Sequence, residues 1–129
     1  MIRWLSKTKE NLQLGNMAES LAEKHIKAAG LKIIKRNYSC KGGEIDIIAN
    51  DRNAIVFVEV RYRSQSDFGS ALESVTTSKQ KRVIKAAKHY LLSTYGSNEP
   101  ECRFDVIGIQ GTSKKLTWIK NAFEDSQWI

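Results

Sequence analysis

The sequence has no long apolar run. No stretch approaches the roughly 18 consecutive apolar residues of a membrane-spanning helix, and the first residues, MIRWLSKTKENLQLG, contain no apolar segment of signal-peptide length. These absences argue against membrane insertion and secretion. We therefore expect a cytoplasmic protein that does not contact a membrane.

Cysteine and proline are also scarce, with two cysteines and one proline in 129 residues. Cys40 and Cys102 stand apart from each other, and neither belongs to a CxxC motif or to a cysteine and histidine cluster of the kind that binds structural zinc. In a cytosolic chain, two isolated cysteines are most often reduced thiols. We therefore expect neither a zinc site nor disulfide stabilisation.

The composition is that of an ordinary globular protein, with 41% hydrophobic and 27% charged residues. The length suits a single domain over residues 1–129, with a core at about 11–123. Lysine and arginine together number 21 and the acids 14, which gives a net charge of +7. This excess favours polyanionic partners, chiefly nucleic acid.

Apolar residues at helical spacing predict a helix over residues 11–29, with Asn11 as its N-cap and Gly30 as its C-terminal stop. His25 falls in the middle of the apolar face. We expect it to be a partly buried structural histidine rather than a ligand or catalytic group. The predicted apolar face consists of Leu14, Ala18, Leu21, Ala22 and Ala29.

The rest of the chain predicts a second helix and four or five strands. A short polar connector, residues 50–53, separates two of the strands, so these should pair as an antiparallel hairpin. The order of elements indicates an α/β fold, with a mixed central sheet flanked by helices. The strands are expected at 31–38, 44–49, 54–60, 102–109 and 116–119, and the second helix at 78–94.

Acidic residues interrupt the two strands of this hairpin. Because side chains alternate along a strand, Glu44 and Asp46 should share one face of the first strand with Ile48. Glu59 and Arg61 should likewise share one face of the second strand. If the register aligns the acids, Asp46 and Glu59 point into one small space, where two carboxylates repel each other unless a cation lies between them.

A pair of facing carboxylates suits a hard divalent cation such as Mg²⁺, which takes oxygen ligands. Metal-bound water is a good nucleophile, and the metal stabilises charge on a phosphoryl oxygen. With Arg61 beside the acids, the constellation suits phosphodiester hydrolysis. The alternative is that the acids lie on a solvated face of the sheet and pair with arginines, and the spacing does not decide between the two.

Several motifs together resemble the YraN-like family of uncharacterised bacterial proteins, over about residues 15–123. The resemblance implies a restriction-endonuclease-like fold of the PD-(D/E)xK superfamily, similar to archaeal Holliday-junction resolvases, and with it a possible homodimer. The motifs are GNMAE, GGEIDIIA, VFVEVRYR, SKQKRVIKAAKHYL and RFDVIGI.

The resemblance implies a role for each acid. Glu19 would be the acid on the first helix, Asp46 the strand aspartate and Glu59 the acid of the (D/E)xK element. Asp46 and Glu59 would bind Mg²⁺ or Mn²⁺, with Glu19 binding directly or through water. Arg61 stands where the superfamily has lysine, and arginine cannot act as a base. Lys79, on the second helix, could supply the missing lysine.

Further residues could assist or bind the substrate. Gln80 lies beside Lys79, and Glu44 could assist the metal or pair with a basic neighbour. Asp105 is expected to pair with Arg103. The implied partner is nucleic acid, more likely DNA; the alternatives are an inactive nucleic-acid-binding module and an adaptor that binds an acidic protein. The expected phosphate-contacting residues are Arg61, Arg63, Lys79, Lys81 and Lys85.

Overall fold

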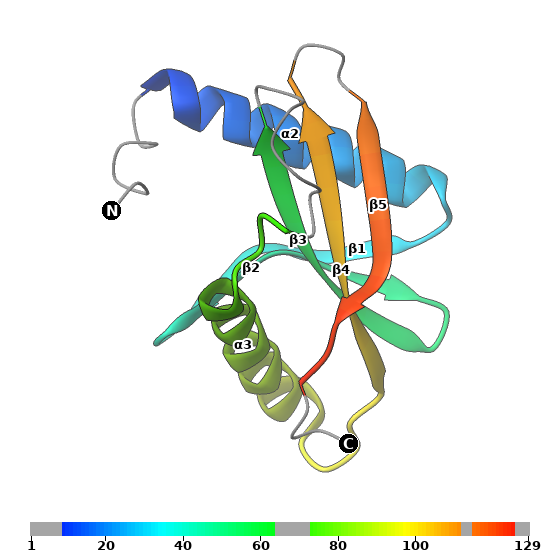
Figure 1. Cartoon of the computed structure of the whole chain (residues 1–129). Coiled ribbons are helices and arrows are strands. Elements are labelled where there is room, and N and C mark those ends of the chain that lie inside the picture. The colour runs from blue at the N-terminus through cyan, green and yellow to red at the C-terminus, as the bar shows by residue number, and fades with distance from the viewer. Residues whose placement is uncertain (1–8, 64–72, 112–114, 126–129) are drawn as a thin grey trace.

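The structure is a computed structural model, and it describes residues 9–63, 73–111 and 115–125. Within these residues, two helices and five strands follow one another in the order shown in Figure 1. They are α2 (Lys9–Ala28), β1 (Lys32–Cys40), β2 (Gly43–Asp51), β3 (Ala54–Arg63), α3 (Thr77–Tyr95), β4 (Glu101–Gln110) and β5 (Leu116–Phe123).

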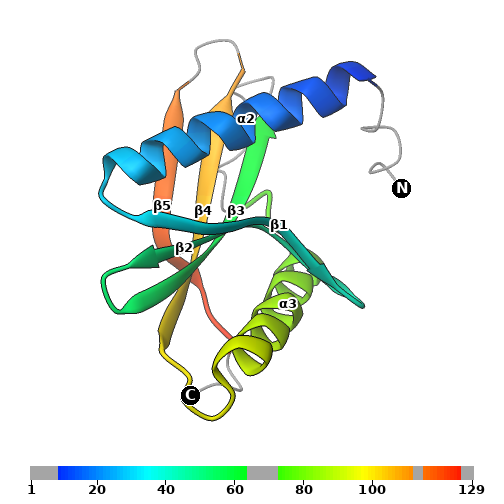
Figure 2. The ribbon, with the colours of Figure 1, turned by 180° about the vertical axis from the view of Figure 1, so that it is seen from behind.

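The strands form a single sheet in the order β1-β2-β3-β4-β5. β3 and β4 run parallel to each other, and every other neighbouring pair is antiparallel. Helix α2 packs on one face of the sheet and α3 on the other, as Figures 1 and 2 show from opposite sides. The predicted α/β fold, a mixed sheet flanked by helices, is confirmed. Neither helix is long and apolar enough, within the described residues, to cross a membrane.

Helix α2 packs on the sheet through Ala18, Ala22 and Ile26, which are 1%, 0% and 0% exposed. Their spacing of four residues forms one stripe, and the two small alanines let the helix approach the strands closely. His25 is exposed, so the prediction of a partly buried histidine is wrong. Ile26 takes the inward position, because a helical period leaves neighbouring residues on different sides.

The ends of α2 also test the sequence-based prediction. The helix already includes Lys9, so the predicted N-cap at Asn11 is wrong. The predicted stop at Gly30 is confirmed. Gly30 has a φ of 96°, which favours glycine, and its N–H donates to the carbonyl of Lys27 at 3.0 Å.

Helix α3 begins at a side-chain cap. The hydroxyl of Thr76 accepts a hydrogen bond from the backbone N–H of Lys79 at 3.2 Å, and this bond satisfies one of the free donors of the first turn. Its inner face lies over the core on the side of Phe57. The cap therefore fixes where the first turn, with the Lys79 side chain, meets the sheet. The buried residues of α3 are Val83, Ala86, Ala87, Tyr90 and Leu91.

The β2–β3 hairpin closes through a two-residue turn, Arg52 and Asn53, with Arg52 at a φ of 60°. The predicted antiparallel pairing is confirmed, although both strands are longer than predicted. So short a turn fixes the register of the two strands. The acids further along the strands are therefore aligned by the hairpin itself.

Candidate functional site

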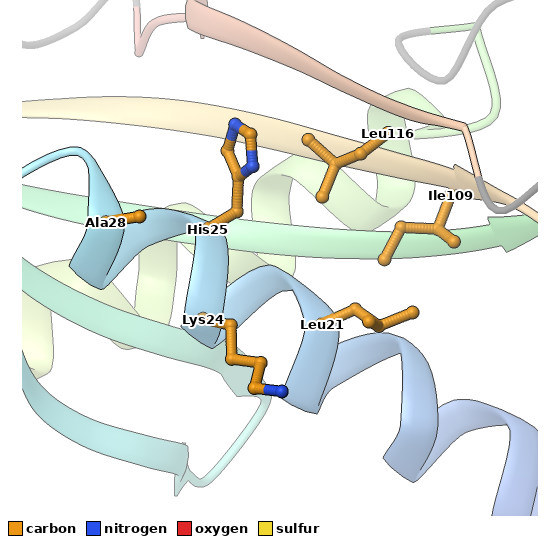
Figure 3. A pocket seen from close by; sticks show the side chains of 6 residues that line it. All are labelled: Leu21, Lys24, His25, Ala28, Ile109 and Leu116. Carbon is orange, nitrogen blue, oxygen red and sulfur yellow. The ribbon is translucent and has the colours of Figure 1, made fainter.

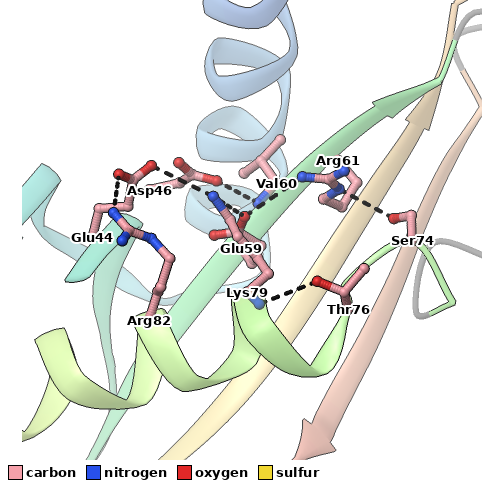
Figure 4. A network of polar contacts seen from close by, with 9 residues as sticks. All are labelled: Glu44, Asp46, Glu59, Val60, Arg61, Ser74, Thr76, Lys79 and Arg82. Atoms are coloured by element: carbon pink, nitrogen blue, oxygen red, sulfur yellow. Dashed lines mark hydrogen bonds and ion pairs between the residues drawn. The ribbon is translucent and has the colours of Figure 1, made fainter. Parts of the chain in front are cut away.

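The site lies where β2 and β3 separate. Their ladder runs from the turn as far as the pair Ile47↔Val58. One step further along the same register, Asp46 lies across from Glu59. Oδ2 of Asp46 accepts a hydrogen bond from the backbone N–H of Val60 at 2.8 Å (Figure 4). The Asp46 side chain thus accepts a hydrogen bond from the backbone of β3 at the point where the β2–β3 ladder ends.

The regular alternation of β2 breaks at Asp46. The β1–β2 register leaves Asn37 across from Asp46, and Asn37 has a left-handed backbone with φ 54°. Ile45 packs in the core under α3, whereas Ile47 packs in the core under α2. Ile45 and Ile47 therefore face opposite sides of the sheet, and the strict alternation that predicted one face for Glu44, Asp46 and Ile48 does not hold at this point of β2. The irregular backbone places Asp46 between the two layers, close to both helices.

Glu59 is 1% exposed and continues the face of β3 that turns toward α3. No donor among the described residues hydrogen-bonds to its Oε1. Burial, and then the charge of Asp46, raise the pKa of Glu59 from an ordinary 4.5 to about 8, against the lowering effect of Lys79. Burial also raises the pKa of Asp46, opposed by the Val60 N–H. The two carboxyl groups therefore cannot both ionise easily without an added cation.

Among the described cations, Lys79 lies nearest to Glu59 of the buried pair. Its Nζ lies 3.4 Å from Oε2 of Glu59 and 3.5 Å from Oε2 of Glu44 (Figure 4). Arg61 is farther away, with Nη1 at 3.8 Å from Oε2 of Glu59, and its Nε donates to Oγ of Ser74 at 3.1 Å. The structure thus places the helix lysine centrally and the strand arginine beside it.

The two predicted accessory residues, Glu44 and Gln80, have different roles: Glu44 contacts cations, and Gln80 bonds to the backbone before α3. Glu44 accepts from Nη2 of Arg82 at 3.2 Å in addition to its contact with Lys79, so it joins the ionic network. Gln80 donates to the carbonyl of Val75 at 3.1 Å. That bond ties the start of α3 to the preceding segment, and Gln80 thus supports the helix that carries Lys79.

Glu19 lies on α2, which covers the face of the sheet opposite to α3. Burial and the charge of Asp46 raise the pKa of Glu19, whereas a hydrogen bond from Arg36 lowers it. Nη2 of Arg36 donates to Oε1 of Glu19 at 3.3 Å. Within the described residues, no group of three or more His, Cys, Asp or Glu is close enough to hold one metal ion. The structure thus brings Asp46 and Glu59 together, whereas Glu19 forms an ion pair with Arg36.

The basic residues predicted to contact phosphate are spread over several surfaces. Lys79 faces the acids, but Lys81 follows it by two residues and so lies on a different side of α3. Lys81 and Lys85 are exposed and four residues apart, and the Lys85 side chain lies against Gly42 of the β1–β2 turn. Arg63 is the last residue of β3. Lys81 and Lys85 therefore border the site at a distance rather than line it.

The donor set fits a hard divalent cation. Two carboxyl groups, Asp46 and Glu59, meet on facing strands, and Oε1 of Glu59 receives no hydrogen bond from the described residues. Mg²⁺ and Mn²⁺ are held by such oxygens, often by only one or two carboxylates. A cation here would neutralise the repulsion that raises the pKa of Glu59. Glu19 would join the pair only by exchanging its contact with Arg36.

A separate hollow of about 380 Å³ lies between α2 and strands β4 and β5 (Figure 3). Its polar groups come from Lys24 and His25, and His25 also meets the ring of Trp118 edge-on at 5.8 Å. None of the predicted site residues lines it. The acids and the hollow are therefore distinct features. The lining residues are Leu21, Lys24, His25, Ala28, Ile109 and Leu116.

Asp105 is a structural acid. It is 0% exposed, and its two carboxylate oxygens share the N–H of Arg103 Nε, at 3.1 and 3.2 Å. It also accepts from Nε1 of Trp118 and from the backbone N–H of Asn121, each at 2.9 Å. The predicted pairing with Arg103 is confirmed. Asp105 joins β4 to β5 where their register shifts.

Arg36 and Ser74 contact the predicted site residues, and sequence reasoning missed both. Arg36 reaches Glu19 from β1, and Ser74 holds Arg61 from the segment before α3. Both contacts join parts of the chain that no periodicity relates. The sequence holds one local hint of an irregular strand beside Arg36. Asn37 is a residue type that tolerates the left-handed backbone it adopts there.

The fold and the site define a mixed α/β protein with a buried carboxylate pair and converging cations at the open end of a hairpin. The chain belongs to the uncharacterised protein family UPF0102, whose model matches residues 18–109. This is the YraN-like family that the motifs indicated. The matched segment includes Glu19, Asp46, Glu59 and Lys79.

Relatives from several bacteria match most of the chain, and each carries the name UPF0102 protein. The one from Nitrosococcus oceani is 49% identical over 113 residues, which cover 84% of this chain and 90% of the relative. The one from Saccharophagus degradans is 49% identical over 111 residues, or 86% and 92% of the two chains. One from Legionella pneumophila is 46% identical over 110 residues, or 85% and 93%. The family assignment thus spans almost the whole domain.

Proposed function

We propose that the protein is a metal-dependent endonuclease that hydrolyses phosphodiester bonds of nucleic acid. The observation that carries this proposal is the buried pair of Asp46 and Glu59. Their carboxyl groups meet on facing strands, Oε1 of Glu59 lacks a donor among the described residues, and the pKa of Glu59 is raised to about 8. Groups with strongly shifted pKa values cluster at functional sites.

The order of elements supports the same proposal. An acid on the first helix, Glu19, precedes an aspartate on β2, and Glu59-Val60-Arg61 follows on β3. The mixed sheet lies between two helices. This is the arrangement that the resemblance to the restriction-endonuclease-like PD-(D/E)xK superfamily implies, and we include that fold assignment in the proposal.

In this proposal Asp46 and Glu59 hold Mg²⁺ or Mn²⁺, which supplies Lewis-acid chemistry to the scissile phosphate and its attacking water. Lys79 then takes the place of the strand lysine. Its ammonium, 3.4 Å from Glu59, can donate to the attacking water or to a phosphate oxygen. Arg61, oriented by Ser74, binds a phosphate oxygen with its guanidinium. Only Lys79 of these two cations can also give up a proton.

The proposed substrate is DNA, including branched DNA, and the proposed assembly is a homodimer. The net charge of +7 supports a polyanionic substrate. The resemblance to archaeal Holliday-junction resolvases favours branched DNA and a dimer. Arg61 and Lys79 would contact the phosphate at the acids, while Arg63, Lys81 and Lys85 would contact phosphates farther along the strand.

The test is cleavage of single-stranded, duplex, flapped and four-way-junction DNA by purified protein in Mg²⁺ or Mn²⁺. We expect cleavage that stops in EDTA and falls by at least about 100-fold in Asp46→Asn. The matched control is Asp51→Asn, the same change on the same strand, in a half-buried pair with Arg103. If no DNA is cut, or Asp46→Asn cuts as well as wild type, the proposal is wrong.

Arg61 in the lysine position favours a second candidate, an inactive nucleic-acid-binding module of the same fold. Such a module would bind DNA with an affinity that falls steeply with salt, because binding releases counterions from the phosphates. It would show neither cleavage nor dependence on a divalent cation. A filter-binding titration between 50 and 200 mM salt, with and without EDTA, distinguishes the two candidates when it is run beside the cleavage assay.

A further inference from the structure

Arg36 binds two acids of α2 from the neighbouring strand. Its Nη2 lies 3.3 Å from Oε1 of Glu19, and its Nη1 lies 3.2 Å from Oε1 of Glu23. Glu19 and Glu23 are one helical turn apart, so one guanidinium spans both. Lys27 then pairs with the other oxygen of Glu23 at 3.1 Å. Glu19 differs from Glu23 in having Arg36 as its only ion-pair partner among the described residues.

Arg36 also lies next to the proposed metal ligands. It pairs with Ile47 in the β1–β2 ladder, so it is one residue pair away from Asp46. Glu19 consequently lies between opposite charges. The charge of Asp46 disfavours ionised Glu19, and the Arg36 guanidinium favours it. A cation bound at Asp46 would attract the Glu19 carboxylate, whose charge Arg36 already offsets.

We propose that Arg36 sets the affinity of the Asp46–Glu59 site for a divalent cation by engaging Glu19. This inference rests on the proposed metal site. It adds Arg36 as a positioning residue that acts on the site through Glu19. With Arg36 in place, Glu19 is paired, and the site offers two carboxylates. Without Arg36, Glu19 is released beside Asp46, and a third carboxylate becomes available to the cation.

Charge arithmetic gives the size of the effect. Removing a positive charge and releasing a negative one both favour a bound cation. Arg36 has a side-chain exposure of 36%, so solvent screens part of this interaction. We expect the dissociation constant for Mn²⁺ to fall by about 5- to 10-fold in Arg36→Gln.

The measurement is a calorimetric titration of the full chain with Mn²⁺ at pH 8. Lys27→Gln is the matched control, because it removes a positive charge from the same cluster but contacts Glu23 and not Glu19. We expect its affinity to stay within about twofold of wild type. Arg36→Lys keeps the charge and should restore most of the wild-type affinity. Arg36→Met, which keeps the apolar stem, gives the same test if Arg36→Gln does not fold.

A double-mutant cycle separates this mechanism from a general charge effect. In a Glu19→Gln background only the loss of the Arg36 charge remains, so adding Arg36→Gln should tighten Mn²⁺ binding by no more than about twofold. If Arg36→Gln tightens binding equally in both backgrounds, or tightens it in neither, Arg36 does not act through Glu19. If the wild type binds no Mn²⁺ at all, the proposed metal site itself is wrong, and the two failures are thus distinct.

Discussion

The ammonium of Lys79 lies 3.4 Å from the carboxylate of Glu59, closer than the guanidinium of Arg61 at 3.8 Å. Lys79 comes from the first turn of α3, and Arg61 comes from the same strand as Glu59. A lysine two residues after the glutamate is therefore not needed to place an ammonium at this carboxylate. The Thr76 cap holds the first turn of α3 in position to do so.

This relationship predicts unequal effects of changing the two cations. Lys79→Met should lower DNA cleavage by at least about 100-fold, because it removes the ammonium nearest the acids. Arg61→Lys should keep activity within about tenfold, because a positive charge remains at the phosphate. Single-turnover cleavage rates measure both effects. Lys88→Met is the control on the same helix, since Lys88 pairs with Asp125 instead of the acids. Equal losses in Lys79→Met and Lys88→Met would contradict the role of Lys79.

The raised pKa of Glu59 predicts a pH-dependent stability without metal. Between pH 4.5 and about 8, the folded state binds a proton on Glu59 that the unfolded state releases. The free energy of unfolding should therefore be highest below this window and fall as the pH rises through it, by a total on the order of 3–5 kcal/mol.

Urea denaturation at several pH values in EDTA measures this slope. Glu59→Gln, which cannot ionise, should flatten it and should be more stable than wild type at pH 8. The exposed Glu101→Gln should leave the slope unchanged. A Glu59→Gln slope as steep as that of wild type would show that another group causes the pH dependence.

The hydrogen bonds of Asp105 predict that its removal strongly destabilises the fold. Asp105→Ala leaves the Arg103 guanidinium, the Trp118 indole N–H and the Asn121 N–H without their common acceptor. We expect a loss of about 3–5 kcal/mol in the free energy of unfolding, measured by urea denaturation. Asp51→Ala, which removes the half-buried second partner of the same arginine, should cost less, about 1 kcal/mol. Similar costs for the two variants would contradict the account of Asp105.

The close approach of Gly43 to α3 predicts that a side chain at this position would clash with the helix backbone. A Cβ at this position would clash with the carbonyl oxygen of Arg82 and would lie 2.9 Å from the backbone nitrogen of Ala86. Gly43→Ala should therefore displace α3 and destabilise the fold by about 1–3 kcal/mol. In α2, a Cβ on Gly15 would meet no described atom within 4 Å beyond the nearby backbone of its own helix, so Gly15→Ala should stabilise by about 0.5–1 kcal/mol. Thermal melts of the two variants should shift in opposite directions.

The elements and the carboxylate pair were within reach of the sequence because they rest on local patterns. Period-two runs on either side of a short polar turn define the hairpin, and the turn fixes its register. That register alone puts Asp46 across from Glu59. Lys79 followed from the resemblance, which implies a lysine at the acids where the strand carries Arg61.

Long-range and irregular features were not predictable in this way. The Arg36 contact with Glu19 joins residues 17 apart in a helix and a strand, and no spacing rule relates them. The break in alternation beside Asp46 depends on the left-handed backbone of Asn37, which tertiary packing selects. His25 and Ile26 compete for one inward position, and only the docking angle of α2 on the sheet decides between them.

The most direct test is a crystal structure of the protein soaked in Mn²⁺ at pH 8, with an anomalous difference map. The account predicts an anomalous peak between the carboxyl groups of Asp46 and Glu59, within about 2.0–2.3 Å of an oxygen of each. The peak should disappear in Asp46→Asn crystals soaked in the same way. A map without a peak at this pair, or with Mn²⁺ bound only elsewhere, would contradict the central claim.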